Sequence, residues 1–231
     1  MLQPLTTTHN LIDRTYQQIL QAIADGTLAP SQRIRQAELA DSLGVSRQPV
    51  SHALHLLKRQ GLVEEAGRQG LRVIPLDPLR VKQLYQVREA IDGLAARLAA
   101  QTVATQITAG RSSNAETDAL QRQLADGMQF TAATPIPILV RADTDFHRAV
   151  YRLSANPAIE EITAPWWPHL MRSMATVLRE PNYATRVWHH EHAEILHHIL
   201  AGDPARAETA ARAHAATAAR LTDEQLQPQA A

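Results

Sequence analysis

The chain has 231 residues, 45% hydrophobic and 20% charged, which is the composition of an ordinary globular protein. Its 23 Lys and Arg balance 23 Asp and Glu, and aromatics make up only 4%, which favours helix over sheet. The absence of cysteine excludes disulfides, thiolate metal ligands and a cysteine nucleophile. No apolar run reaches membrane-spanning length and the first ten residues do not resemble a signal peptide, so we expect a cytoplasmic protein with no membrane partner.

The first third of the chain alternates helical periodicity with strong helix breakers. Gly44 ends one short helix, and Ser46 is placed to cap the next one. A glycine-containing turn then separates two β-type runs. The predicted elements are helices at 11–24, 36–43 and 47–60, followed by β-type runs at 62–65 and 71–75. This order predicts a winged helix-turn-helix.

The segment Pro75-Leu76-Asp77-Pro78 reads as a linker, in which Asp77 can cap a new helix that has Pro78 at its first position. Everything beyond it has helical periodicity, and Pro165 and Pro168 should kink or interrupt the fourth helix of this part. The predicted helices are 78–103, 115–130, 137–154, 157–178, 184–201 and 204–223. The expected fold is therefore mainly α, with a winged helix-turn-helix at 1–75, a linker at 76–79 and an all-helical effector and dimerisation bundle at 80–231.

Charge is unevenly distributed along this neutral chain. The segment from Ser31 to Pro75 contains seven Arg or Lys and four acidic residues. This mild basic bias permits DNA binding. With the apolar side of the third predicted helix inward, its N-terminal polar residues face outward, where they could reach base edges in the major groove. The alternative is a solvated helix face. The predicted DNA-binding residues are Arg35, Arg47, Gln48, Ser51, His52, Arg68 and Arg72, the last two on the wing.

The run LADSLGVSRQPVSHALHLLKRQGLVEEAGRQGLRV, from Leu39 to Val73, resembles the DNA-binding domain of the GntR family of bacterial regulators. The resemblance implies operator binding, with Arg47 at a position where the family contacts bases. Two positions where the family contacts DNA depart from its pattern. Ser51-His52 stands where Arg-Glu is frequent, and Ala37 stands where Arg is frequent, so we expect a different operator sequence.

Four polar residues of the second part fall on or beside the apolar stripes of three predicted helices: Asp143, His147, His192 and His214. Buried groups of this kind need partners, because an unpaired buried charge costs several kcal/mol. One divalent cation would satisfy all four, and neutral imidazoles with a carboxylate suit Zn²⁺. A hydrogen-bonded core cluster is the alternative. His189 borders the same face as His192 and is a reserve candidate.

Arg88 also occupies an apolar stripe, that of the first helix of the bundle. Two interpretations remain open. Arg88 could form an internal ion pair with Asp92, four residues on. It could instead anchor a carboxylate ligand, which a guanidinium binds through two parallel hydrogen bonds.

The helical part resembles the effector domain, of the FCD type, of the FadR-like branch of the GntR family. The resemblance lies in LYQVREAIDGLAARLAA, DTDFHRAVYRLSANP, EHAEILHHILAGD and ARAHAATAARL. In metal-containing members of that branch an Asp and three His hold a cation, and these positions fall on Asp143, His147, His192 and His214. The carboxylate-contacting arginine falls on Arg88. Asp92 departs from the branch, which usually has Glu there.

The sequence suggests three functions. The first is a ligand-responsive regulator, expected to be a repressor, that binds palindromic operator DNA as a homodimer and a small organic acid at a metal-assisted site. The second is a metal sensor whose effector is the cation itself. The third is a metal-dependent hydrolase or lyase, which the sequence does not favour because it contains no HExxH, nucleophile-elbow, phosphate-loop or dinucleotide motif. We therefore expect a regulator and not an enzyme.

Overall fold

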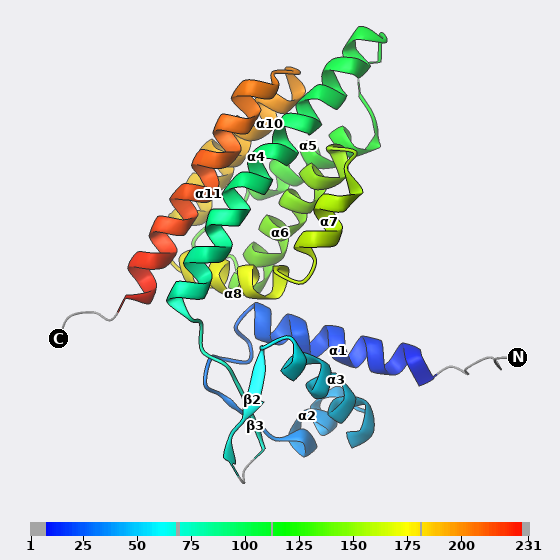
Figure 1. The fold of residues 1–231 in the computed structure, drawn as a ribbon, viewed down its shortest axis with the longest axis vertical. Coiled ribbons are helices and arrows are strands. Elements are labelled where there is room, and N and C mark those ends of the chain that lie inside the picture. The colour runs from blue at the N-terminus through cyan, green and yellow to red at the C-terminus, as the bar shows by residue number, and fades with distance from the viewer. Residues whose placement is uncertain (1–7, 68–69, 112, 181, 228–231) are drawn as a thin grey trace, which may run out of the picture. The chain divides into compact units, whose positions relative to one another are not determined.

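The computed structural model describes residues 8–67, 70–111, 113–180 and 182–227, and the chain divides into two compact units, Met1–Leu76 and Asp77–Ala231. The predicted fold class is confirmed: a small winged helix-turn-helix is followed by an all-helical bundle (Figure 1). In the residues described, no helix combines the length and apolar character needed to cross a membrane.

Within its described residues, 8–67 and 70–76, the N-terminal unit contains three helices and a three-stranded antiparallel sheet with strand order β1-β3-β2. Its elements are α1 (Thr8–Ala24), β1 (Arg33–Ile34), α2 (Gln36–Leu43), α3 (Arg47–Arg59), β2 (Val63–Glu65) and β3 (Leu71–Val73). Gly44 ends α2 with φ of 63°, a left-handed conformation that glycine adopts without strain. Ser46 occupies the N-cap position of α3, although its side chain makes no capping hydrogen bond.

Strand β1 was not predicted, because two residues are too few to produce an alternating pattern. The register pairs Ile34 with Leu71 and Val63 with Val73, so the hairpin gains a third strand. One hydrophobic core joins the helices to this sheet, and Val50, Leu54 and Leu57 on the inner side of α3 are completely buried in it. This packing fixes which side of α3 faces outward.

The second unit is built only of helices among its described residues. They are α4 (Pro78–Thr108), α5 (Ala115–Gly127), α6 (Ile136–Leu153), α7 (Pro157–Thr163), α8 (Trp167–Val177), α9 (Tyr183–Arg186), the π-helical turn η2 (Val187–His192), α10 (Ala193–Leu200) and α11 (Pro204–Leu226). The Asp77 carboxylate caps α4 by accepting from the backbone N–H of Leu79 at 3.0 Å, as predicted. The long helix expected at 157–178 is interrupted between Thr163 and Trp167, around Pro165.

Helices α4 and α11 pack side by side along much of their length, and α6 packs against α4, α5 and α8 (Figure 1). The interior of the bundle contains large apolar side chains such as Trp188, Phe146 and Tyr85. It also contains several buried polar residues, which need polar partners in this apolar interior.

Candidate metal and effector site

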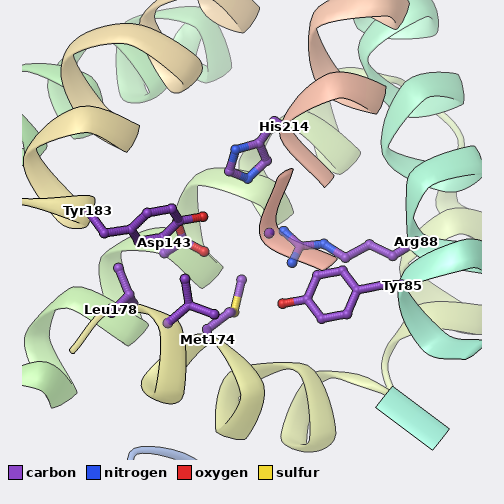
Figure 2. A pocket seen from close by; sticks show the side chains of 9 residues that line it. Tyr85, Arg88, Asp143, Met174, Leu178, Tyr183 and His214 are labelled. Carbon is purple, nitrogen blue, oxygen red and sulfur yellow. The ribbon is translucent and has the colours of Figure 1, made fainter. Parts of the chain in front are cut away.

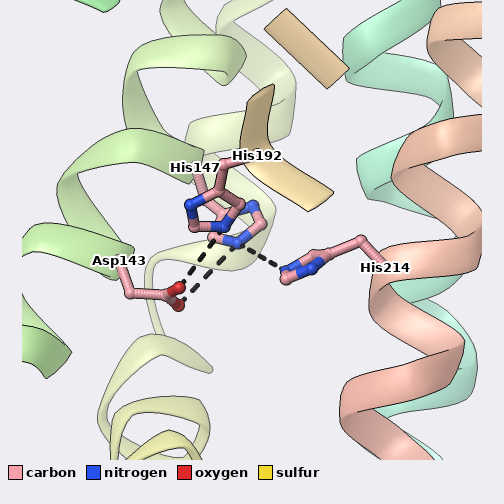
Figure 3. A group of neighbouring side chains, drawn as sticks. All are labelled: Asp143, His147, His192 and His214. Carbon is pink, nitrogen blue, oxygen red and sulfur yellow. Dashed lines mark hydrogen bonds and ion pairs between the residues drawn. The ribbon is translucent and has the colours of Figure 1, made fainter. Parts of the chain in front are cut away.

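Three helical segments bring four potential ligands together inside the bundle (Figure 3). Asp143 and His147 lie one turn apart on α6, His192 ends the π-helical turn η2, and His214 lies on α11. All four are buried, and one ligand atom from each lies within 4.8 Å of the others. The sequence predicts the burial of each residue separately, and the structure brings these four into one cluster that could hold a metal ion.

The helix that contributes His192 is less regular than predicted. The expected helix at 184–201 contains a π-helical turn, Val187–His192, between α9 and α10. A π-turn closes its hydrogen bond over one more residue than an α-turn, so it changes the direction in which the following side chains point, and such turns are frequent at functional sites. Hydrophobic periodicity contains no signal for a single π-turn.

Aromatic rings enclose the His192 imidazole. Phe146 stacks on it with ring centroids 4.1 Å apart, and Trp188 approaches edge-on at 4.5 Å. Gly127 makes room for the indole, because a Cβ at that position would collide with the Trp188 ring. His192 is therefore held in one orientation by packing.

Neither ring nitrogen of His192 has a hydrogen-bond partner among the described residues, although both are buried. An unsatisfied buried polar group costs about 1–3 kcal/mol, so the arrangement requires an explanation. The Nε2 atom of His192 lies 3.4 Å from Oδ1 of Asp143, too far for a good hydrogen bond. A cation between them would bind both Nε2 of His192 and Oδ1 of Asp143. The unpartnered imidazole is the best indication that the residues fit a metal.

The electrostatics of the cluster favour uncharged imidazoles at His147 and His192. Burial lowers the pKa of both His147 and His192 well below the usual value, and the positive charge of Arg88 lowers it further. Burial also raises the pKa of the Asp143 carboxyl. A bound cation would reverse that last preference, because it stabilises the carboxylate. Neutral imidazoles with free lone pairs are the form in which histidine binds metals.

Arg88 lies beside this cluster and is engaged with two of the buried groups. Its Nε donates to Oδ2 of Asp92 at 3.0 Å, and its Nη2 lies 2.7 Å from Nε2 of His147. The tyrosine hydroxyl of Tyr151 donates to the other oxygen of Asp92. Of the two interpretations left open by the sequence, the ion pair with Asp92 is present in the structure.

A small cavity adjoins the cluster (Figure 2). Its lining residues are Tyr85, Arg88, Asp143, Met174, Val177, Leu178, Tyr183, His214 and Ala218. The space available to the centre of a water-sized sphere is about 10 Å³, roughly what one water molecule requires. A larger ligand would have to displace side chains of the bundle.

The other histidines near the cluster do not join it. The reserve candidate His189 is exposed, and its Nε2 lies 3.0 Å from the backbone carbonyl of Met128. His190 and His197 are exposed as well. Sequence reasoning missed Glu191, which contacts His214 inside the bundle, because a glutamate next to a candidate ligand has no distinctive spacing.

In the N-terminal unit the predicted DNA-contacting side of α3 is accessible, since Arg47, Gln48, Ser51 and His52 are all exposed. Two further predicted residues form surface ion pairs. Arg35 contacts Glu38 at 2.8 Å, and Arg72 of β3 contacts Glu64 of β2 at 2.7 Å. Arg68 lies outside the described residues.

Comparison with known proteins agrees with both units. Residues 11–73 match the family described as bacterial regulatory proteins, gntR family, and residues 83–217 match the FCD domain. An uncharacterized HTH-type transcriptional regulator of Bacillus subtilis, YdhC, is 27% identical, and the match covers 64% of this chain and 62% of that protein. A probable D-xylose utilization operon transcriptional repressor of Paenarthrobacter nicotinovorans is 29% identical over 86% of this chain and 82% of its own length.

The structure of E. coli McbR/YncC has a similar fold, with a TM-score of 0.79 and 17% identity over 96% of this chain and all of that one. A winged helix-turn-helix followed by a helical bundle with a buried polar cluster defines a two-domain transcription regulator. The chain belongs to the GntR family and has an FCD effector domain. The protein is therefore a regulator and not an enzyme, as the sequence predicted.

Proposed function

We propose that this GntR-family regulator is a repressor that binds palindromic operator DNA as a homodimer and responds to a small organic acid at a metal-assisted site. The proposed metal is zinc, and its ligands are Asp143, His147, His192 and His214. The DNA-binding domain is assigned to residues 1–75 and the effector and dimerisation domain to 80–231, with 76–79 as the linker.

The observation that carries the metal proposal is the imidazole of His192, a member of the four-residue cluster whose ring nitrogens have no hydrogen-bond partner among the described residues. The Nε2 atoms of His147 and His214 lie only 3.2 Å apart, close enough for one cation to bind both. Three imidazoles and one carboxylate are a nitrogen and oxygen donor set that suits zinc and its neighbours in the transition series. A zinc ion held by these groups would stabilise the bundle and could offer a further coordination position to a ligand oxygen.

The proposal of an organic acid rests on the cavity beside the cluster. Asp143 and His214 belong to both the cavity wall and the cluster, and Arg88 beside the cluster also lines the cavity, so a ligand there would meet the guanidinium and the metal ligands together. A guanidinium binds carboxylates better than it binds neutral groups. Met174, Val177 and Leu178 form an apolar wall, and an acid would have to displace side chains there, because the cavity has room for about one water molecule.

The DNA proposal rests on the exposed N-terminal half of α3, with Arg47 as the principal base-contacting residue. Arg35, Arg68 and Arg72 would add contacts to the DNA phosphates. The ion pairs of Arg35 and Arg72 with glutamates oppose this only weakly, because exposed pairs contribute little and exchange readily. Two copies related by a two-fold axis would read a palindrome, each with one winged domain.

Metal sensing is the second candidate function, and one observation favours it. Arg88 is already engaged with Asp92 and His147, and the neighbouring cavity has room for about one water molecule. If the cation is the effector, removal of the metal changes operator affinity and carboxylates do not.

The test measures zinc content by elemental analysis, then melting temperature and operator affinity with a panel of mono-, di- and tricarboxylates, each compared with its neutral amide. The proposal expects about one metal ion per chain and at least one acid, but not its amide, that shifts both quantities. A metal-loaded protein that ignores every acid but loses its operator response on chelation is the metal sensor. If the protein holds no metal and chelators change nothing, the four residues are a hydrogen-bonded core cluster.

A further inference from the structure

We propose that Glu191 is a positioning residue of the metal centre, an outer carboxylate that fixes the ring orientation and tautomer of His214. This inference rests on the proposed metal site and adds a residue to it. Glu191 is not one of the four proposed ligands: it contacts Nδ1 of His214, whereas His147 lies at Nε2 on the other side of the ring.

The contact between the two residues is short and sheltered. Oε2 of Glu191 lies 2.7 Å from Nδ1 of His214, whose side chain is 3% exposed, while that of Glu191 is 18% exposed. The other carboxylate oxygen, Oε1, lies 3.4 Å from Nη2 of Arg186. The carboxylate is thus held from both sides, with the arginine toward solvent and the imidazole toward the interior.

This contact determines which nitrogen of His214 is available inside the bundle. A carboxylate only accepts hydrogen bonds, so Nδ1 of His214 must carry the proton that is donated to Glu191. The lone pair of the neutral ring is then on Nε2, the atom that faces Nε2 of His147 at 3.2 Å. A histidine that binds a metal through one nitrogen commonly donates its other N–H to a carboxylate in this manner, which also makes the ligand more basic.

The π-helical turn explains how neighbouring residues can serve the same centre. Glu191 and His192 are consecutive, and in an α-helix consecutive side chains diverge strongly around the axis. A π-turn has more residues per turn, which narrows that divergence. One irregular turn therefore supplies both a proposed direct ligand, His192, and the outer partner of a second ligand, His214.

Among the described residues, neither of the other two histidines has so close a carboxylate partner on its Nδ1 atom. Nδ1 of His147 lies 3.6 Å from Oδ2 of Asp92, which is beyond hydrogen-bond distance. Nδ1 of His192 has no partner among the residues that the structure describes. The orientation of His214 is therefore set by a hydrogen bond, whereas that of His192 is set by packing against Phe146 and Trp188.

The first experiment measures the zinc affinity of the full-length protein by competition with a chromophoric chelator. Glu191→Ala should lower that affinity by about 10- to 100-fold, the usual effect of removing an outer-shell partner. Glu191→Gln should recover part of the loss, because the amide oxygen can accept the same hydrogen bond without the charge. Glu194→Ala is the matched control, an exposed glutamate three residues further along the chain on α10, and should bind zinc like the wild type. Melting curves in chelator should show that all three variants fold.

The second experiment does not depend on metal. Long-range proton–nitrogen correlation spectra of the chelated protein should show His214 as the Nδ1–H tautomer in the wild type, and the Nε2–H form should gain population in Glu191→Ala. Unchanged zinc affinity and an unchanged tautomer in Glu191→Ala would overturn the inference while leaving the metal site intact. If the wild type binds no zinc, the metal proposal fails instead, and the tautomer result still decides whether Glu191 positions His214.

Discussion

Arg88 donates from Nε to Oδ2 of Asp92 at 3.0 Å, and the two side chains are only 1% and 3% exposed. A buried ion pair contributes little net stability, but removing one partner strands the other charge in a medium that cannot solvate it. A substitution that tests Arg88 as the proposed carboxylate anchor must therefore keep a positive charge beside Asp92.

Arg88→Ala should lower the free energy of unfolding by about 3–5 kcal/mol, because it leaves the Asp92 carboxylate buried without its cation. Chemical denaturation with the metal removed by chelator would measure this loss. The double variant Arg88→Met with Asp92→Leu should recover part of it, because removing both charges leaves neither one uncompensated, while the Tyr151 hydroxyl loses its acceptor. A stable Arg88→Ala protein would show that Asp92 does not depend on this arginine.

Arg88→Lys is the better probe of effector binding. Lysine keeps a positive charge near Asp92 but cannot form the two parallel hydrogen bonds that a guanidinium gives to a carboxylate. We expect metal content and operator affinity without effector to stay close to those of the wild type. The melting-temperature shift produced by an effective carboxylate should fall. An undiminished shift would remove Arg88 from the effector site.

Removing two proposed ligands, His147→Ala with His192→Ala, should abolish metal binding. A cation bound only by the folded state adds to stability, about 4 kcal/mol when its concentration is a thousand times its Kd. Chelator should therefore lower the melting temperature of the wild type and have no effect on this variant. The pair His190→Ala with His197→Ala, both exposed, is the control and should keep its metal. Equal metal content in the two double variants would contradict the ligand assignment.

Arg47→Ala should reduce the affinity for specific operator DNA by about 1–3 kcal/mol, the value of one good base contact. Binding isotherms on operator and on random DNA, at the same salt concentration, would separate loss of base reading from loss of charge. Arg59→Ala, an exposed arginine at the other end of α3, controls for charge. If Arg47→Ala discriminates between operator and random DNA as well as the wild type does, α3 is not the reading helix.

Sedimentation at micromolar concentration should give twice the chain mass of 25.5 kDa. A palindromic operator should bind much more tightly than a single half-site, because two winged domains on one dimer add their contacts. A monomer that still binds the full operator tightly would contradict the homodimer.

Much of the fold follows from local sequence signals. Gly44 ends α2, Asp77 and Pro78 begin α4, and Pro165 lies in the break between α7 and α8, because each acts on the backbone within a few residues. The two-residue strand β1 exists only through its pairing with β3, so no local pattern predicts it. No local pattern predicts the π-helical turn Val187–His192 either, because its residues keep the apolar spacing of an ordinary helix.

The candidate site was likewise only partly predictable from local sequence. Position on an apolar stripe is a property of one helix, so the sequence alone determined that Asp143, His147, His192 and His214 are buried polar groups. The tertiary structure alone decided that they meet, that Glu191 supports His214, and that Arg88 pairs with Asp92 and reaches His147. Helical spacing tells which way a side chain faces, whereas its partner depends on how helices far apart in the sequence pack together.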